Sequence, residues 1–507
     1  MKMWLWLWTG WLWAQAPLQT LAPWSDHMVL QQHTQVVLRG LAPAQQPVNI
    51  QCSWNHKIYR AESQANGLWE VRLQTPKASF KPQHIEVRCG QDKLNVQDVL
   101  IGEVWLSSGQ SNMEWTLKRV TNAPTEVAAA QYPHIRLFQV KRAQSNTPQT
   151  QVPKGSEWVA CTPESAAGFS AMSYYFAVEL QARLHCPIGI LNANWGGTGA
   201  ESWTPEGPMR GNPALKGVYE RWEQWQQQRP SDSLTYQELK KNNPKAEMPK
   251  SLYMLQRPHR RPSVLYNAMI HPLVPYTLKG VIWYQGTSNR SWAYEYTDQM
   301  QALIAGWREA WGADMPFYYL QLSAFGYSDS HMANVIRESQ TATLALPHTA
   351  MATVLDLGDL SDIHTPNKKP YGHRLAQMAM SKSYGDPREY CGPLLKKAVF
   401  KKNEAVLSFT HADSLHIASP PQSLYIAGAD RQFHWAQAYV KKGKLHVYSP
   451  EVPQPVAVRY NWNNCPQTAL SNAAHLPASP FRTDRWNEVD VPVWPLPKTE
   501  STDGQAP

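Results

Sequence analysis

A serine and a histidine that lie far apart in the chain have the residue types and the surroundings of a nucleophile and its base. Ser111 follows an apolar segment, residues 99–107, and comes two residues after Gly109. A glycine at a strand-to-helix turn permits unusual backbone dihedrals, and a serine placed there projects its hydroxyl from the end of the sheet. A serine hydroxyl is a poor nucleophile unless a base lies within hydrogen-bond reach. Such turns are common, so Ser111 predicts chemistry only together with a partner.

His364 is the predicted base among the 17 histidines because of its position. It lies in a loop after the apolar segment 350–355, and this loop is expected to leave the same edge of a parallel sheet as Ser111. Asp362, two residues earlier, is expected to orient the imidazole and to stabilise its protonated form, with Asp359 as the rival. The alternative is that these polar residues cap a helix that begins after His364.

Two more strand ends supply candidate donors for an oxyanion hole. The segment 188–194 is followed by a Gly-Gly turn that contains Gly197, and the segment 280–284 is followed by Gln285 and, four residues later, Asn289. A backbone N–H of glycine and two side-chain amides could stabilise the negative charge of a tetrahedral intermediate. Each loop alone could be a plain turn, but polar loops on four strand ends of one sheet favour an active site.

The elements that must position these residues are those of an α/β protein. From about residue 96 to 390, near-continuous apolar strands alternate with helical stretches, which indicates a parallel sheet covered by helices on both faces. Ligand sites in such sheets lie beyond the carboxyl ends of the strands. The predicted strands are 99–107, 188–193, 280–284, 317–322 and 350–355, and the predicted helices are 173–184, 294–311, 334–345 and 372–383.

The flanking regions are different in pattern. Residues 21–95 contain short alternating strands separated by turns, which predict a small β-sandwich, and residues 391–490 contain a second β-region. Residues 216–250 are polar and rich in glutamine, and are expected to form a helical insertion or a long loop. Residues 491–507 are polar and proline-rich, which predicts a disordered tail.

Residues 1–16 have the pattern of a signal peptide: a lysine, an apolar stretch and an Ala-Gln-Ala end. We therefore expect a secreted or periplasmic protein, although a buried N-terminal helix or an uncleaved anchor would share this pattern. The six cysteines fit an oxidising compartment, and Cys52 with Cys89 is the expected disulfide. The cysteines lack C-x-x-C spacing, so no zinc site is predicted.

Composition excludes several classes of protein. With 43% hydrophobic and 17% charged residues the chain is expected to fold, and no later apolar segment is long enough to span a bilayer. The net charge of +9 is not gathered in a basic run, so no nucleic-acid partner is predicted. The 23 tryptophans could stack on sugars or simply fill the core.

Several motifs in register resemble those of one family. They are Gly-Gln-Ser-Asn-Met at 109–113, Asn-Trp-Gly-Gly-Thr at 194–198, Trp-Tyr-Gln-Gly at 283–286 with Asn289, and Asp-Ile-His at 362–364. From about residue 21 to 485 the chain resembles the sialate O-acetylesterase family of the SGNH-hydrolase superfamily.

The resemblance implies a flavodoxin-like SGNH hydrolase domain with flanking β-sandwich-like domains, and hydrolysis of acetyl esters on sialic acids or related sugars. Ser111 would be the nucleophile, His364 the base and Asp362 its acid partner. The oxyanion hole would be formed by residues of two loops, Gly197, Gln285 and Asn289. The resemblance implies an acetylated carbohydrate as substrate and neither a metal nor an organic cofactor.

One departure from the family motif leaves alternatives open. The family usually has a glutamate after Gln-Gly, where this chain has Thr287. A relative that binds carbohydrate but has lost activity is therefore one alternative. The other is an acetyl esterase of plant polysaccharides such as xylan, because the predicted catalytic loops would contact the acetyl ester and not the sugar.

Overall fold

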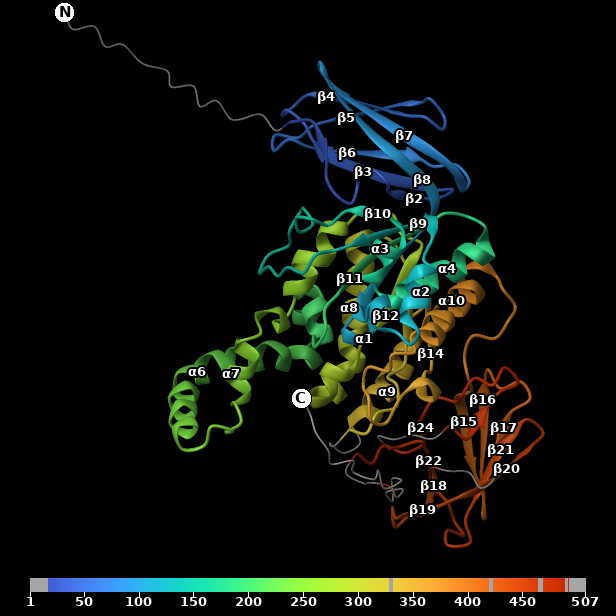
Figure 1. Ribbon diagram of the computed structural model, residues 1–507. Coiled ribbons are helices and arrows are strands. Elements are labelled where there is room, and N and C mark those ends of the chain that lie inside the picture. Colours follow the sequence, from blue (N-terminus) through green and yellow to red (C-terminus); the bar gives the residue numbers. More distant parts are fainter. Residues whose placement is uncertain (1–16, 328–331, 419–422, 464–467, 488–490, 492–507) are drawn as a thin grey trace, which may run out of the picture.

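The computed structural model describes residues 17–327, 332–418, 423–463, 468–487 and 491, and the predicted signal peptide, Cys465 and nearly all of the predicted tail lie outside these ranges. Three regions follow one another along the molecule in Figure 1: a β-region at the top, an α/β region in the middle and a second β-region at the bottom. Within the described residues no helix is both long and apolar enough to cross a bilayer.

The N-terminal region consists of two facing sheets around one apolar core. Buried and exposed residues alternate along its strands, as in β4, because each strand has one face on the core and one face in water. One sheet contains β1 (Gln19–Thr20), β3 (Gln35–Leu41) and β6 (Leu68–Gln74). The other contains β4 (Pro47–Cys52), β5 (Ile58–Glu62) and β7 (Ser79–Cys89), with β2 (Val29–Gln31) and the first part of β8 (Asp92–Gly109).

Strand β8 joins this region to the central sheet. It is 18 residues long, and its last eleven residues are all buried. Its first part pairs with β7 and its last part pairs with strands of the central sheet. The predicted boundary between residues 95 and 96 therefore falls inside a single strand.

The central sheet is parallel in the order β9-β11-β8-β12-β13-β14, with β10 antiparallel to β9 at one edge. β11, β12 and β13 are buried along their whole length, as expected of strands whose sheet is covered by helices on both faces. The strands are β9 (Tyr132–Gln139), β10 (Trp158–Cys161), β11 (Ile188–Asn194), β12 (Gly280–Tyr284), β13 (Phe317–Leu320) and β14 (Thr349–Ala352).

Alternate residues of these strands pack into two separate cores. Trp105 of β8 packs on the side of α4 and α10, and the next residue, Leu106, packs on the side of α8 and α9. These helices are α4 (Ala171–Leu184), α8 (Tyr296–Trp311), α9 (Met332–Ala342) and α10 (Lys369–Tyr384). The shorter helices are α1 (Ser111–Glu114), α2 (Ala123–Ala128), α3 (Pro163–Ala167) and α5 (Glu206–Arg210).

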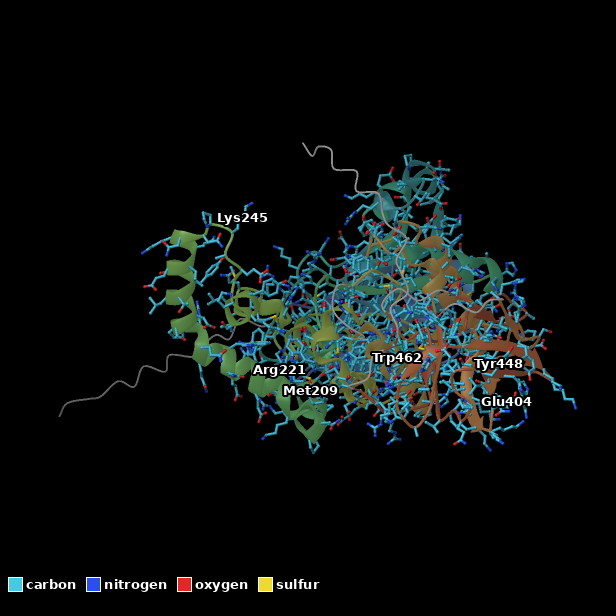
Figure 2. The ribbon with its side chains drawn as sticks, turned by 90° about the horizontal axis from the view of Figure 1, so that it is seen from below. Met209, Arg221, Lys245, Glu404, Tyr448 and Trp462 are labelled. Carbon is cyan, nitrogen blue, oxygen red and sulfur yellow. The ribbon has the colours of Figure 1, made fainter. Side chains whose placement is uncertain are left out.

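The polar insertion is helical and projects from the body as an arm. Helix α6 (Lys216–Asn242) leaves the body and α7 (Lys250–Leu255) returns to it, with Lys245 near the tip and Arg221 near the root (Figure 2). Arg221 bonds both oxygens of Glu295 at 2.7 Å, which fixes the root of the arm to the central α/β region.

The C-terminal region contains antiparallel sheets with their own core. It is joined to the central region by Arg482, whose guanidinium pairs with Glu338 of α9 at 2.8 Å. One four-stranded sheet contains β15 (Leu394–Phe400), β16 (Ala405–Thr410), β21 (Lys444–Tyr448) and β20 (Gln437–Lys441). The other contains β19 (Phe433–Trp435), β18 (Leu424–Ala427), β22 (Ala457–Tyr460) and β24 (Phe481–Arg482), and β17 (His416–Ile417) pairs with β23 (Leu470–Ser471).

The expected disulfide between Cys52 and Cys89 is wrong. Both thiols are buried and free, although they lie on the paired strands β4 and β7. The register places Cys52 opposite Ile85 and Cys89 opposite Val48, so the two cysteines are four residue pairs apart. At about 3.3 Å per residue this separates them by about 13 Å, beyond the roughly 7 Å Cα–Cα limit of a disulfide.

Replacing Gly109 by alanine should strongly destabilise the fold. Its φ is +144°, and an added Cβ would collide with the carbonyl oxygen of Tyr284 on β12. We expect Gly109→Ala to lower the free energy of unfolding by about 3 kcal/mol or more, measured by urea denaturation. The control is Gly443→Ala, where φ is +68° but no atom lies near the added Cβ, with an expected cost of about 1–2 kcal/mol. An equal loss of unfolding free energy in the two variants would contradict the close approach of the Tyr284 carbonyl to Gly109.

Candidate active site

Ser111 lies at the carboxyl end of β8, where it begins helix α1. Three strands end level there, because the register pairs Gly109 with both Asn194 of β11 and Tyr284 of β12. The Ser111 Oγ is 2.9 Å from the Nε2 of His364. The structure thus brings together the two residues that the sequence predicts as nucleophile and base, across 253 positions of the chain.

The surroundings of His364 keep its imidazole neutral. Its ring is stacked against Trp115, with centroids 5.5 Å apart and an angle of 15° between the planes. Partial burial lowers the pKa of His364 below its ordinary value of 6.5, the positive charges of Lys368 and Arg119 lower it further, and the carboxylate of Asp362 opposes them. A neutral imidazole can accept the serine proton at neutral pH.

Asp362 lies beside His364 but does not bond its ring. Its carboxylate accepts the backbone N–H of His364 at 2.8 Å, and among the described residues no hydrogen bond joins this carboxylate to the imidazole. The carboxylate of Asp359 accepts the hydroxyl and N–H of Ser361, at 2.7 and 2.8 Å, so it braces the loop. The predicted role of Asp362 as the acid partner remains a prediction, and its charge acts on His364 through space.

The Gly-Gly turn after β11 lies directly against the nucleophile. A Cβ added to Gly196 would be 3.1 Å from the Cβ of Ser111. The N–H of Gly196 donates to a carboxylate oxygen of Glu114 at 2.9 Å, whereas the N–H of Gly197 has no acceptor among the described residues. The N–H of Ser111, the first residue of α1, also has no intrahelical acceptor. The backbone at this turn therefore offers candidate oxyanion donors.

Gln285 and Asn289 form a buried brace between loops. The amide nitrogen of Gln285 donates to the Thr198 carbonyl at 3.1 Å and to the side-chain oxygen of Asn289 at 2.7 Å. The amide nitrogen of Asn289 donates to Glu201 at 2.8 Å. Neither residue lines the cavity in front of Ser111. Their role as oxyanion donors stays a prediction, and in this structure their amides hold the loops together.

The loop that contains Thr287 is held without a carboxylate at that position. The side-chain oxygen of Gln110 accepts the N–H groups of Gly286 and Ser288, each at 3.3 Å. On the other side of the loop Glu201 accepts from Asn289, as described above, and burial raises the pKa of Glu201. The departure from the family motif therefore leaves a braced loop.

A cavity of about 510 Å³ opens in front of Ser111 and His364. Four basic residues line it: Lys118, Arg119, Lys141 and Arg142. The guanidinium of Arg119 lies 3.7 Å from the centroid of Trp115, which places a cation and an aromatic face beside the base. The lining includes a single acidic residue, Glu114, which forms an ion pair with Arg142.

Several residues that surround Ser111 and His364 were not predicted from the sequence. Trp115 comes four residues after Ser111, and Lys368 comes four residues after His364. Such spacing places two residues on one face only where the chain is helical, and α10 begins after Lys368, so the spacing could not have located this residue. The basic lining could not be found in this way, because it comes from two separate segments, residues 118–119 and 141–142.

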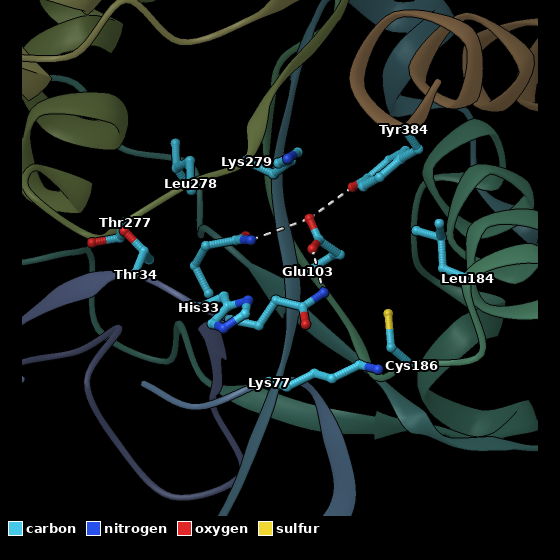
Figure 3. A pocket seen from close by; sticks show the side chains of 12 residues that line it. His33, Thr34, Lys77, Glu103, Leu184, Cys186, Thr277, Leu278, Lys279 and Tyr384 are labelled. Atoms are coloured by element: carbon cyan, nitrogen blue, oxygen red, sulfur yellow. Dashed lines mark hydrogen bonds between the residues drawn. The ribbon is translucent and has the colours of Figure 1, made fainter. Parts of the chain in front are cut away.

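A second cavity, of about 660 Å³, lies at the opposite end of the strands from Ser111, and Figure 3 shows the residues that line it. The buried carboxylate of Glu103 accepts hydrogen bonds from Gln31 at 3.1 Å, Gln32 at 2.7 Å and the Tyr384 hydroxyl at 2.7 Å. Glu103 precedes Gly109 by six residues on β8, about 20 Å at 3.3 Å per residue. These bonds join the N-terminal β-region to α10, far from the nucleophile.

The second cavity has no activated nucleophile. Burial raises the pKa of its thiol, Cys186, to about 12, so the thiolate is scarce at neutral pH. Among the described residues no group of three or more histidine, cysteine, aspartate or glutamate side chains is placed to hold a metal ion.

An organophosphate fluoride should label Ser111 with a rate set by His364. Because the neutral imidazole is the base and its pKa lies below 6.5, the labelling rate should rise with pH and reach half its maximum below pH 6.5. His364→Ala should slow labelling by about 10²–10⁴-fold, and Ser111→Ala should prevent it, as measured by mass spectrometry. Labelling of a different residue, or a midpoint above pH 6.5, would contradict the assignment.

Comparison with known proteins shows which family this chain resembles. Residues 253–381 match the family described as "Carbohydrate esterase, sialic acid-specific acetylesterase". The chain is 31% identical over 431 residues to the sialate O-acetylesterase of Mus musculus, covering 76% of this chain and 78% of that protein. It is 30% identical to the Homo sapiens protein of the same name, with 76% of each covered.

A solved structure extends the likeness to the fold. The crystal structure of a carbohydrate acetylesterase from Xanthomonas citri superposes with a TM-score of 0.80 at 35% identity, covering 93% of this chain and 100% of that one. The chain therefore belongs to the sialate O-acetylesterase family and is a carboxylic ester hydrolase.

Proposed function

We propose that this protein is an exported serine esterase that removes O-acetyl groups from sialic acids through an acetyl-enzyme intermediate. The observation that carries the proposal is the 2.9 Å hydrogen bond between Ser111 Oγ and His364 Nε2 at the wall of a basic cavity. The parallel sheet, with its site at the carboxyl ends of the strands, supports an SGNH-type α/β domain. The signal-peptide pattern of residues 1–16 supports export.

The first half of the reaction transfers the acetyl group to the enzyme. His364 accepts the proton of Ser111 as the serine oxygen bonds to the acetyl carbonyl carbon. The negative charge on the carbonyl oxygen is stabilised by backbone N–H groups at the Gly197 turn and at the start of α1. When the bond to the sugar oxygen breaks, His364 returns the proton to that oxygen and the sugar leaves as an alcohol.

The second half of the reaction regenerates the enzyme. His364 takes a proton from a water molecule, whose oxygen bonds to the carbonyl carbon of the acetyl-enzyme. The second tetrahedral intermediate collapses, Ser111 recovers its proton from His364, and acetate is released. Water is the only other reactant, and the acetic acid that leaves gives its proton to the solvent as it becomes acetate.

The charge of the cavity favours an acidic sugar over a neutral polysaccharide. Sialic acids carry a carboxylate, whereas the xylose backbone of xylan is neutral. Lys118 and Lys141 line the cavity and form no ion pair among the described residues, so they are available to a ligand carboxylate.

Ser111→Ala and His364→Ala should each abolish the release of acetate from O-acetylated sialic acid. We expect kcat to fall by roughly 10⁴-fold or more, because the nucleophile or its base is removed. Ser231→Ala, on the exposed arm, is the matched control and should leave turnover unchanged. Circular dichroism checks the fold, and wild-type turnover in Ser111→Ala would refute the proposed mechanism.

Lys141→Met should weaken the binding of acidic substrates selectively. The KM for O-acetylated sialic acid should rise about tenfold, since a hydrogen bond to a charged group contributes about 1.5–3 kcal/mol. The KM for the neutral ester 4-nitrophenyl acetate should not change. Lys154→Met, outside the cavity lining, is the control. A second measurement compares substrates for the unmodified enzyme. Faster release of acetate from acetylated xylan than from O-acetylated sialic acid would show that the proposed substrate is wrong.

A further inference from the structure

Asn112, the residue after the nucleophile, is bonded at both ends of its amide to the segment that carries the base. Its Nδ2 donates to the backbone carbonyl of Ile363 at 2.9 Å, and its Oδ1 accepts from the Nζ of Lys368 at 2.5 Å. Ile363 immediately precedes His364, and Lys368 follows His364 by four residues. One buried amide therefore ties helix α1 to the segment on both sides of the base.

Lys368 is fully buried, with 0% of its surface exposed, and no carboxylate lies within ion-pair distance among the described residues. Its ammonium instead lies over two aromatic rings, 5.5 Å from the centroid of Trp115 and 5.1 Å from that of Tyr371. Burying an ammonium carries a large desolvation penalty, and cation–π contacts offset only part of it. An apolar side chain would pack at lower cost, so the charge itself requires a reason.

The charge acts on His364. Three charged groups influence the imidazole: Lys368 before α10, Arg119 after α1, and Asp362 in the same loop. The two cations lower the pKa of His364 and the carboxylate raises it. Burial lowers the pKa of Lys368 to about 7. The ammonium is therefore still protonated in the acidic range in which His364 gains its proton.

We propose that Asn112 and Lys368 form a positioning pair for the reaction of Ser111. The amide holds the loop of His364 over the serine hydroxyl, and the buried ammonium keeps the imidazole in its base form in mildly acidic solution. This inference rests on the proposed function, because it requires Ser111 and His364 to be the working nucleophile and base.

Lys368→Met tests the electrostatic part. Removal of the charge should shift the acidic limb of kcat/KM for 4-nitrophenyl acetate to higher pH by about 0.5–1 unit, because His364 then gains its proton more readily. Lys369→Met is the matched control, because this neighbouring lysine is exposed and pairs with Glu126 at 3.1 Å. The acidic limb of the pH profile should not move in this variant. Lys368→Arg keeps the charge and should restore the limb.

Asn112→Ala tests the positioning part. Loss of both bonds should lower kcat about 10- to 100-fold, since small misplacements of reacting groups cost about this much, while KM stays within about twofold. Circular dichroism and thermal unfolding check each variant. If Lys368→Met does not fold, Lys368→Gln gives the same neutral comparison and can still donate to Asn112.

Each part has its own contrary result. If the acidic limb of the kcat/KM profile lies at the same pH in Lys368→Met and Lys369→Met, the electrostatic role is overturned. An unchanged kcat in Asn112→Ala would overturn the positioning role. The pH dependence of organophosphate labelling, measured in the same variants, needs no sugar substrate. A further outcome is that the labelling rates and their pH dependence are as expected while neither the unmodified enzyme nor any variant releases acetate from O-acetylated sialic acid. In that case the substrate proposal fails and the positioning pair stands.

Discussion

The level ending of three parallel strands is the constraint on which the site depends. β8, β11 and β12 meet at Gly109, where the backbone of β12 comes so close that no side chain fits. Because the strands end at the same height, the turns that follow them converge on Ser111. The turn after β11 then touches the nucleophile, and the loop after β12 is bonded to Gln110 beside it. A shift of one residue in any of these registers would separate the loops.

Local sequence patterns were sufficient to predict several strands and helices of the central region. The segment 280–284 is a strand with the predicted bounds, and the helices near 173–184 and 372–383 were located to within a few residues. Each of these patterns lies within one short, continuous stretch of residues, so it can be recognised from the sequence alone. The error at Cys52 and Cys89 has the opposite origin, because alternation indicates which residues face the core but not which residues lie opposite one another.

The same distinction applies to the catalytic residues. Ser111 and His364 could be paired from sequence because parallel strands place their following loops at one edge. The partners of a side chain in that cluster depend on tertiary geometry, so the contacts of Asp362, Gln285 and Asn289 could not be predicted from the motifs that contain them. Asp362 bonds backbone and the two amides bond each other.

Burial is the largest cause of the low pKa of His364, and Arg119 links that pKa to the basic cavity, because it lines the cavity and also lowers the pKa. Positive charge that attracts an anionic sugar also opposes the protonation of the base, and the base must become an imidazolium as Ser111 attacks. A substrate carboxylate bound beside Arg119 would cancel part of that positive field at the moment when His364 gains its proton. Under the proposed function, the charge of an acidic sugar therefore assists the chemical step as well as binding. A neutral acetyl ester in the same cavity would leave the opposition between the cations and the imidazolium in place.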